Sequence, residues 1–159
     1  MNKGNKIDFT GQPIYVGMDV HKKSWSVSIH TKHFEHKTFT QPPEVEKLAR
    51  YLQRTFPGAT YYTVYEAGFS GFWIHDRLQE QGIHCMVVNP ADVPTKHKEK
   101  AGKADKVDCR KLARNLRSGD IKGIYIPSRV HTEDRHLIRT RHSMVRKQTR
   151  CKNQIKSIL

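Results

Sequence analysis

Residues 14–21 read IYVGMDVH, an apolar run interrupted by a single acid, Asp19. A second run, SWSVSI, follows at residues 24–29 and alternates polar with apolar residues. The two runs predict two strands that are joined by a tight turn at Lys22 and Lys23. A carboxylate buried without a partner costs free energy, so Asp19 should lie at the strand's end or face a cation. This stretch leaves two interpretations open, a solvated turn aspartate or one member of a functional group of acids.

The remaining sequence predicts a mixed α/β sheet flanked by helices. A third strand at 33–39 completes an antiparallel meander, and a helix opens at Pro42 and Pro43. The β-branched and aromatic run at 60–65 predicts a strand with Glu66 at its end, in the same position as Asp19. The later elements are predicted as follows: a helix at 72–82, a strand at 83–88 buried on both faces, a basic loop at 94–103, a helix at 103–118, a short strand at 124–127 and a helix at 131–159.

Composition points to a polyanionic partner. The chain has 159 residues, enough for one domain with appendages, and 29 Lys+Arg against 15 Asp+Glu give a net charge of +14. Clustered basic residues bind phosphates with release of counterions, so nucleic acid is the expected partner. No apolar run approaches the ~20 residues of a membrane span, and we expect no membrane role. Residues 1–6 lack a signal-peptide core, and the three cysteines have no CxxC spacing, which favours a reducing cytoplasm.

The sequence predicts that the two ends of the chain lie outside the domain that contains the sheet. Residues 1–12 are polar and aperiodic and predict a disordered arm, and 13–128 predict the domain. Residues 129–159 predict the start of a helical coiled coil and thereby a homo-oligomer. The heptad seam consists of Leu137, Met144, Cys151 and Ile158, beside Ile138, Val145 and Leu159. The helix runs to Leu159 without a capping signal, so we expect the chain to be the amino-terminal piece of a longer protein.

Two further acids, Asp105 and Asp108, lie three residues apart on the helix predicted at 103–118. That spacing places their Cβ atoms about 5–6 Å apart on one helical face. The basic neighbours Lys103, Lys106, Arg110 and Lys111 could simply balance their charge, and the pair alone leaves this alternative open. Together with Asp19 and Glu66, however, the pair supplies the few carboxylates that Mg²⁺ needs for two-metal phosphoryl chemistry.

Aromatic residues follow Glu66 at Phe69, Phe72 and Trp73. They could stack on nucleic-acid bases, but an aromatic cluster at helical spacing is more often part of a core. We expect these three side chains to be buried.

Four segments, in order, resemble the consecutive motifs of the DEDD transposases of bacterial insertion sequences, typed on insertion sequence 110 and related to the Piv-type DNA invertases. They are GMDVHK (17–22), YEAG (65–68), VVNP (87–90) and KADKVDCRKLAR (103–114). The resemblance runs from about Ile14 into the last helix. This sequence has Ala104 where the family often has Thr, a change beside Asp105 that leaves the ligand set intact.

The resemblance implies an RNase H-like (RuvC-like) fold in which Asp19, Glu66, Asp105 and Asp108 are the metal-binding catalytic acids. Mg²⁺ is the implied ion, with Mn²⁺ as its substitute. The strand carrying Asp19 should then be internal, with Asp19 at the same end of the sheet as Glu66. In the family, a helical coiled coil leads to a carboxy-terminal domain with a catalytic serine, which we expect to lie beyond Leu159. The family members studied most closely use a guide RNA, encoded by the element, that bridges donor and target DNA.

Nucleic-acid contacts are expected from the basic loop and helices, which offset the repulsion between acids and phosphates. The candidates are Lys22, Lys96, Lys98, Lys100, Lys103, Arg110, Arg114, Arg139, Arg146 and Arg150. The leading hypothesis is the catalytic domain of a DNA transposase or recombinase. A structure-specific nuclease of the same fold, such as a junction resolvase, and a non-catalytic nucleic-acid-binding module are the alternatives.

Overall fold

The computed structural model describes residues 8–94 and 105–158, apart from the side chains of Asp105 and Arg129. The chain divides after Ile124 into two compact units. The first unit contains β1 (Pro13–Val20), β2 (Trp25–His30), β3 (Glu35–Gln41), α1 (Val45–Thr55), β4 (Thr60–Glu66), α2 (Trp73–Glu80), β5 (His84–Val88), the short 3-10 helix η1 (Pro90–Asp92) and α3 (Asp105–Ser118). The second contains α4 (Arg129–Lys156).

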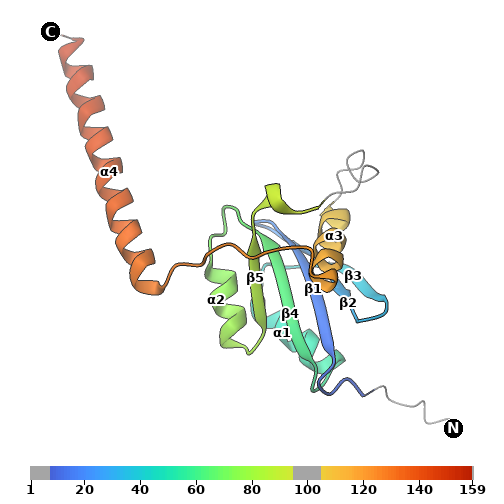
Figure 1. The fold of residues 1–159 in the computed structure, drawn as a ribbon. Helices are drawn as coiled ribbons and strands as arrows, with labels where there is room; N and C mark the ends of the chain where they lie inside the picture. The colour runs from blue at the N-terminus through green and yellow to red at the C-terminus, as the bar shows by residue number, and fades with distance from the viewer. Residues whose placement is uncertain (1–7, 95–104, 159) are drawn as a thin grey trace. The chain divides into compact units, whose positions relative to one another are not determined.

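The first unit is built on a five-stranded sheet with strand order β3-β2-β1-β4-β5. The three amino-terminal strands pair antiparallel, as the meander predicted, whereas β4 pairs parallel with both β1 and β5. The sheet is therefore mixed, and β1 lies at its centre with a neighbour on each side (Figure 1). Both features confirm the sequence-based prediction.

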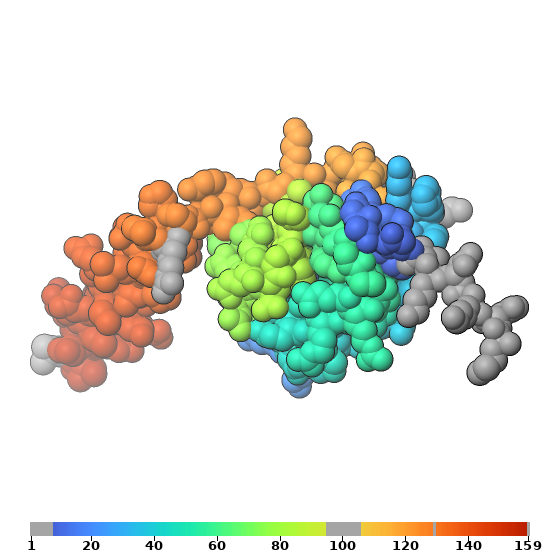
Figure 2. All heavy atoms as spheres, turned by 90° about the horizontal axis from the view of Figure 1, so that it is seen from below, coloured from blue at the N-terminus to red at the C-terminus, as the bar shows by residue number. Residues whose placement is uncertain are grey.

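Helices α1 and α2 cover one face of the sheet. Alternate β1 residues Ile14, Val16 and Met18 point to this face and are fully buried. The Phe39 ring of β3 packs against Tyr51 of α1 with ring centroids 5.0 Å apart, and Trp25 of β2 lies 6.0 Å from Trp73 of α2. The two helices lie next to each other in Figure 2, where α1 is teal and α2 yellow-green.

Helix α3 covers the opposite face, directly over β1 (Figure 1). The close approach depends on Gly17, because a Cβ at this position would overlap the carbonyl oxygen of Cys109 and the amide nitrogen of Ala113. Both of these are backbone atoms of α3, so no change of rotamer could relieve the overlap. The glycine thereby fixes the distance between the central strand and the helix that carries Asp105 and Asp108.

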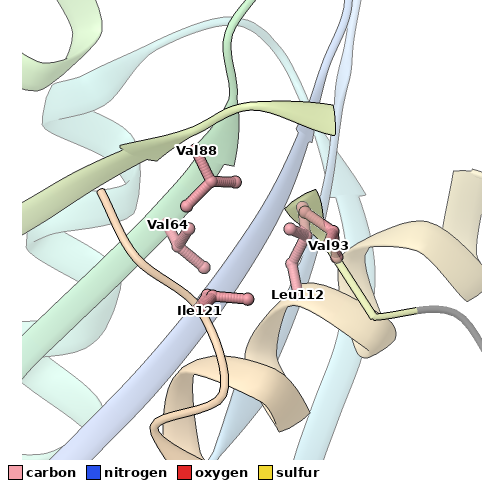
Figure 3. Close-up of a cluster of buried hydrophobic side chains, with 5 residues drawn as sticks. All are labelled: Val64, Val88, Val93, Leu112 and Ile121. Carbon is pink, nitrogen blue, oxygen red and sulfur yellow. The ribbon is translucent and has the colours of Figure 1, made fainter. Parts of the chain in front are cut away.

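A small apolar cluster anchors α3 on this face. It joins Val64 of β4 and Val88 of β5 to Leu112 of α3, with Val93 and Ile121 from the flanking segments, all of them buried (Figure 3). These apolar contacts thus hold α3 against the sheet near the end where β1 and β4 finish and the acids lie. The acids at that end lie beside this cluster and not within it.

Two sequence-based predictions for the strands differ from the structure. The run at 83–88 forms an edge strand, because the five-stranded sheet of the described residues ends at β5, and only Val87 and Val88 of β5 are buried. The segment 124–127 is not a strand. Its Ile124 amide donates one hydrogen bond to the Val87 carbonyl oxygen at 2.8 Å, and Pro127 has no amide hydrogen with which to extend the pairing.

The amino-terminal arm predicted at 1–12 lies partly outside the described residues, which begin at Asp8. Residues 8–12 pack against the turn between α1 and β4. The Phe9 ring meets Phe56 edge-on at 4.9 Å, and the Gly11 amide donates to the Gly58 carbonyl oxygen at 2.8 Å. The aromatic ring at position 9 thus gives this polar segment a fixed contact.

The second unit is a single 28-residue helix, α4. Its amino terminus is capped by the Ser128 hydroxyl, which accepts a hydrogen bond from the His131 amide at 3.4 Å. Apolar side chains along the helix are exposed, namely Val130, Leu137, Ile138, Met144, Val145 and Ile155, and so is Ile158 just after its end. Of the predicted heptad seam, Leu137, Met144 and Cys151 lie on α4, whereas Ile158 follows the last residue of the helix and Leu159 lies outside the described residues. The pairing of this helix into a coiled coil stays a prediction. None of the helices in the described residues is long and apolar enough to cross a membrane.

Candidate metal and nucleic-acid site

Asp19 lies next to the last residue of β1, on the face that α3 covers. Because side chains alternate along a strand, Asp19 points to the same face as Gly17, two residues earlier. Its side chain is 22% exposed, and its Oδ2 atom is 3.1 Å from His21 Nε2. The acid is therefore held at the edge of the apolar core and is partly exposed.

Glu66 is the last residue of β4 and lies beside Asp19. The two strands are parallel and Met18 is in register with Tyr65, so the next residues along them are Asp19 and Glu66. The Glu66 side chain is 34% exposed. The prediction that both acids end neighbouring strands at one end of the sheet is confirmed.

Asp108 approaches the same place from α3. Its Oδ1 atom lies 3.3 Å from Lys111 Nζ, and the same ammonium lies 3.8 Å from Glu66 Oε1. One cationic group thus connects an acid of α3 to an acid of β4. Asp105, the first residue of α3, is one helical turn before Asp108, and its side chain lies outside the described residues.

The electrostatics of Glu66 reflect this convergence. Burial raises the pKa of its carboxyl group, the Lys111 ammonium opposes that rise, and the neighbouring charges of Asp108 and Asp19 add to it. Burial also raises the pKa of the Cys109 thiol to about 12, with a further contribution from the Asp19 charge. The Cys109 thiol is therefore protonated at neutral pH and is not a metal ligand in this state.

The chemistry of these side chains suits a hard divalent cation. Carboxylate oxygens of Glu66 on β4 and Asp108 on α3 face a region that already attracts the Lys111 ammonium. Asp19 on β1 lies beside Glu66. Among the described side chains, however, no three His, Cys, Asp or Glu residues are close enough together to form a metal-binding group. The type of these oxygen ligands therefore suits a divalent ion, whereas in this structure two of the carboxylates are arranged around the ammonium group of Lys111.

Lys111 is the residue of this site to which the sequence did not assign a function. The sequence suggested it only as one of four basic residues that might balance Asp105 and Asp108. The structure bears out that part of the alternative, because Lys111 pairs with Asp108, whereas Arg110 instead bonds Glu35 Oε1 at 2.8 Å. The three-residue spacing from Asp108 was the available signal, since it places both side chains on one helical face.

The prediction that the aromatic cluster is buried is wrong for Phe69 and Trp73, which are exposed, and Phe72 is only half-buried. Phe69 is 61% exposed and Trp73 is 47% exposed. Helix α2 begins only at Trp73, so Phe69 lies in the preceding loop and helical periodicity does not apply to it. Lys22 Nζ from the β1–β2 turn lies 5.9 Å from the centre of the Phe69 ring, and the Tyr65 hydroxyl anchors the loop by donating to the Gly71 carbonyl oxygen at 2.9 Å.

The predicted nucleic-acid contacts are distributed over both units. Lys22, Arg110 and Arg114 belong to the first unit, and Arg139, Arg146 and Arg150 are exposed along α4. The remaining candidates, Lys96, Lys98, Lys100 and Lys103, lie outside the described residues. The Arg110 guanidinium is engaged with Glu35 and with Thr38 at 3.2 Å, so a phosphate would have to compete for it.

Comparisons with known proteins agree with this geometry. A transposase family model, of the DEDD type from insertion sequence 110, matches residues 16–159. The "Putative transposase y4rJ" of Sinorhizobium fredii is 34% identical over 102 residues, which cover 60% of this chain and 26% of the relative. The transposase for insertion sequence element IS1533 of Leptospira borgpetersenii is 30% identical over 110 residues, 66% of this chain and 31% of the relative. The chain thus spans about a quarter to a third of the length of these relatives.

Among solved structures, RuvC of T. thermophilus in complex with a Holliday junction substrate aligns with a TM-score of 0.50 at 11% identity. The alignment covers 70% of this chain and 99% of that chain. At this identity the likeness is one of fold. It confirms the prediction of a RuvC-like (RNase H-like) mixed sheet flanked by helices.

Proposed function

The chain belongs to the DEDD transposase family of insertion sequence 110, and we propose that its first unit is the metal-dependent domain that cleaves and exchanges DNA strands during transposition. Asp19, Glu66, Asp105 and Asp108 are its metal-binding catalytic residues in this proposal. The observation that carries the proposal is the convergence of Asp19, Glu66 and Asp108 from β1, β4 and α3 at one end of the sheet.

The chain's own residues prepare this site in three ways. Parallel pairing of β1 with β4 sets Asp19 beside Glu66. The close approach of α3 at Gly17 brings Asp108 to the Lys111 ammonium that also contacts Glu66. Burial of Glu66 weakens its preference for the charged form, so the site gains from a bound cation. A bound Mg²⁺ or Mn²⁺ would supply charge stabilisation for the attacking and leaving oxygens of a phosphodiester.

DNA is the proposed substrate of this site. The net charge of +14 provides the attraction that four carboxylates alone would oppose. The exposed Phe69 ring, with Lys22 beside it, stands on the loop directly after Glu66 and offers a stacking surface for an unpaired base. Lys22 and the basic residues Arg110 and Arg114 of α3 are proposed to contact the phosphate backbone.

The complete recombination reaction needs more than the domain described above. We propose that a carboxy-terminal serine domain and a structured guide RNA complete the recombination reaction. The exposed apolar seam of α4 supports self-association through that helix. The bacterial cytoplasm, where chromosomal DNA is accessible, is the proposed compartment.

Calorimetric titration of Mn²⁺ into the purified chain tests the site. The wild type is expected to bind, and the double variant Asp19→Ala/Asp105→Ala is expected to lose binding because two of four ligands are gone. An exposed acid outside the site, Asp92, provides the matched control in Asp92→Ala, which should bind like the wild type. Equal affinity in the double variant and the wild type would exclude these acids as the metal site.

A second candidate function is that of a stand-alone structure-specific nuclease. The RuvC-like fold favours it, since RuvC itself was solved with a Holliday junction substrate. Metal-dependent cutting of a four-way junction by this chain alone would support this function. The Lys111–Asp108 ion pair favours a third candidate, a binding module whose acids are neutralised internally. That module would bind nucleic acid equally well with Glu66→Gln and without metal.

A further inference from the structure

Lys111 has an unusual environment for a lysine in this chain. Of the Lys, Arg, Asp and Glu residues whose burial the structure describes, it is the only one that is buried. Its side chain is 10% exposed, whereas those of its partners Glu66 and Asp108 are 34% and 45% exposed. A charge removed from water in this way needs partners close by, because its lost hydration is otherwise uncompensated.

The partners of Lys111 are two of the acids proposed to hold the metal. The ammonium lies 3.3 Å from Asp108 Oδ1 and 3.8 Å from Glu66 Oε1. It therefore lies among the carboxylate oxygens that a divalent ion would need. An ion that binds these oxygens directly, at about 2.0–2.1 Å for Mg²⁺, cannot share them at close range with an ammonium group.

We infer that Lys111 is a built-in counter-ion of the acid cluster, which holds Glu66 and Asp108 together without metal and is displaced when a divalent ion binds. This inference rests on the proposed metal site. Lysine suits such an exchange, because its charge is carried on a flexible four-carbon stem that can withdraw. Lys111 is thus a positioning residue that sets the affinity of the site for the metal.

A purely structural ion pair is the alternative role for Lys111, and the two roles differ in their effect on metal binding. As a counter-ion, Lys111 competes with the metal, so removing its charge should tighten metal binding. A charge within about 4–6 Å shifts a carboxyl pKa by about 1–3 units, so a gain in affinity for a divalent ion of roughly tenfold or more is expected. As a structural pair remote from the metal, Lys111 would affect folding alone.

The experiment compares the wild type with Lys111→Met, which keeps an unbranched side chain of nearly the same length and removes the charge. Mn²⁺ affinity is measured by calorimetry, and the thermal midpoint is measured in EDTA and in excess Mn²⁺. Lys111→Met should bind Mn²⁺ about tenfold more tightly, melt at a lower temperature in EDTA and gain more from Mn²⁺ than the wild type. Lys47→Met, at an exposed position of α1, controls for the loss of one positive charge and should match the wild type. Lys111→Arg should restore wild-type affinity, because it returns the charge.

The outcomes separate this inference from the metal site itself. If Lys111→Met binds Mn²⁺ with unchanged or weaker affinity, while Asp19→Ala/Asp105→Ala abolishes binding, the metal site stands and the counter-ion role is wrong. If neither the wild type nor Lys111→Met binds Mn²⁺, the metal site fails and the inference fails with it. A stabilisation of Lys111→Met in EDTA would also contradict the role, since the lysine would then not hold the acids together.

Discussion

Gly17→Ala should separate α3 from the central strand. The added Cβ would overlap two backbone atoms of α3, at Cys109 and Ala113, and would lie 3.0 Å from Leu112 Cβ. Extra atoms in a packed core cost about 1–3 kcal/mol when side chains can adjust, and here the backbone itself must move, which places the cost at about 3 kcal/mol or more. For a unit of this size, that loss corresponds to a fall in melting temperature of roughly 10 °C.

Thermal unfolding followed by circular dichroism measures the effect of Gly17→Ala directly. Gly68→Ala is the matched control, because its Cβ would meet only the Glu66 carbonyl oxygen, at 3.9 Å. The control should melt close to the wild type, and Gly17→Ala should also weaken Mn²⁺ binding, since Asp108 moves with α3. A Gly17→Ala variant that melts like the wild type would refute the close packing of α3 on β1, and with it the geometry that assembles the acids.

The remaining predictions concern Glu66 and the exposed aromatic ring. Because the pKa of Glu66 is raised, the folded chain holds this proton more tightly than the unfolded chain does. The protonated group therefore stabilises the fold fully below its pKa in the unfolded chain, and this contribution is lost as the pH rises through its pKa in the folded chain. Glu66→Gln lacks this loss, so in EDTA its melting temperature relative to the wild type should increase between about pH 4 and pH 7. A constant difference would contradict the half-buried, acid-rich environment of Glu66. Phe69→Ala should leave the melting temperature unchanged, because the ring is 61% exposed, and should weaken single-stranded DNA binding in fluorescence anisotropy by about 1–3 kcal/mol. Unaltered binding would exclude stacking on this ring.

The placement of the acids could be predicted from sequence because strand ends are readable. Asp19 and Glu66 each follow an apolar or β-branched run, and parallel neighbouring strands bring such ends together. The helix carrying Asp108 was predicted from its apolar spacing. Local sequence patterns could not predict how closely α3 packs against β1. That distance depends on the contact of Gly17 with residues about a hundred positions later in the chain.

The errors in prediction come from contacts that are not local. The run at 83–88 is apolar enough for an interior strand, but β5 is the last strand in the order of the sheet that the described residues form. Phe69 was predicted to belong to a helical core, but α2 begins only at Trp73, so Phe69 lies in the loop before it. The role of Lys111 depends on Glu66, which lies on another element, so only the three-dimensional fold distinguishes it from the other basic residues of α3.

Paramagnetic broadening by Mn²⁺ in nuclear magnetic resonance spectra of the ¹⁵N-labelled chain tests the central claim most directly. A metal held by the four acids should broaden the amide signals at the ends of β1 and β4 and in the first turn of α3, while signals from α1, on the opposite face of the sheet, persist. Glu66→Gln should remove the selective broadening. Broadening that spreads evenly over the chain, or that leaves Asp19 and Glu66 sharp, would contradict a metal site at this end of the sheet.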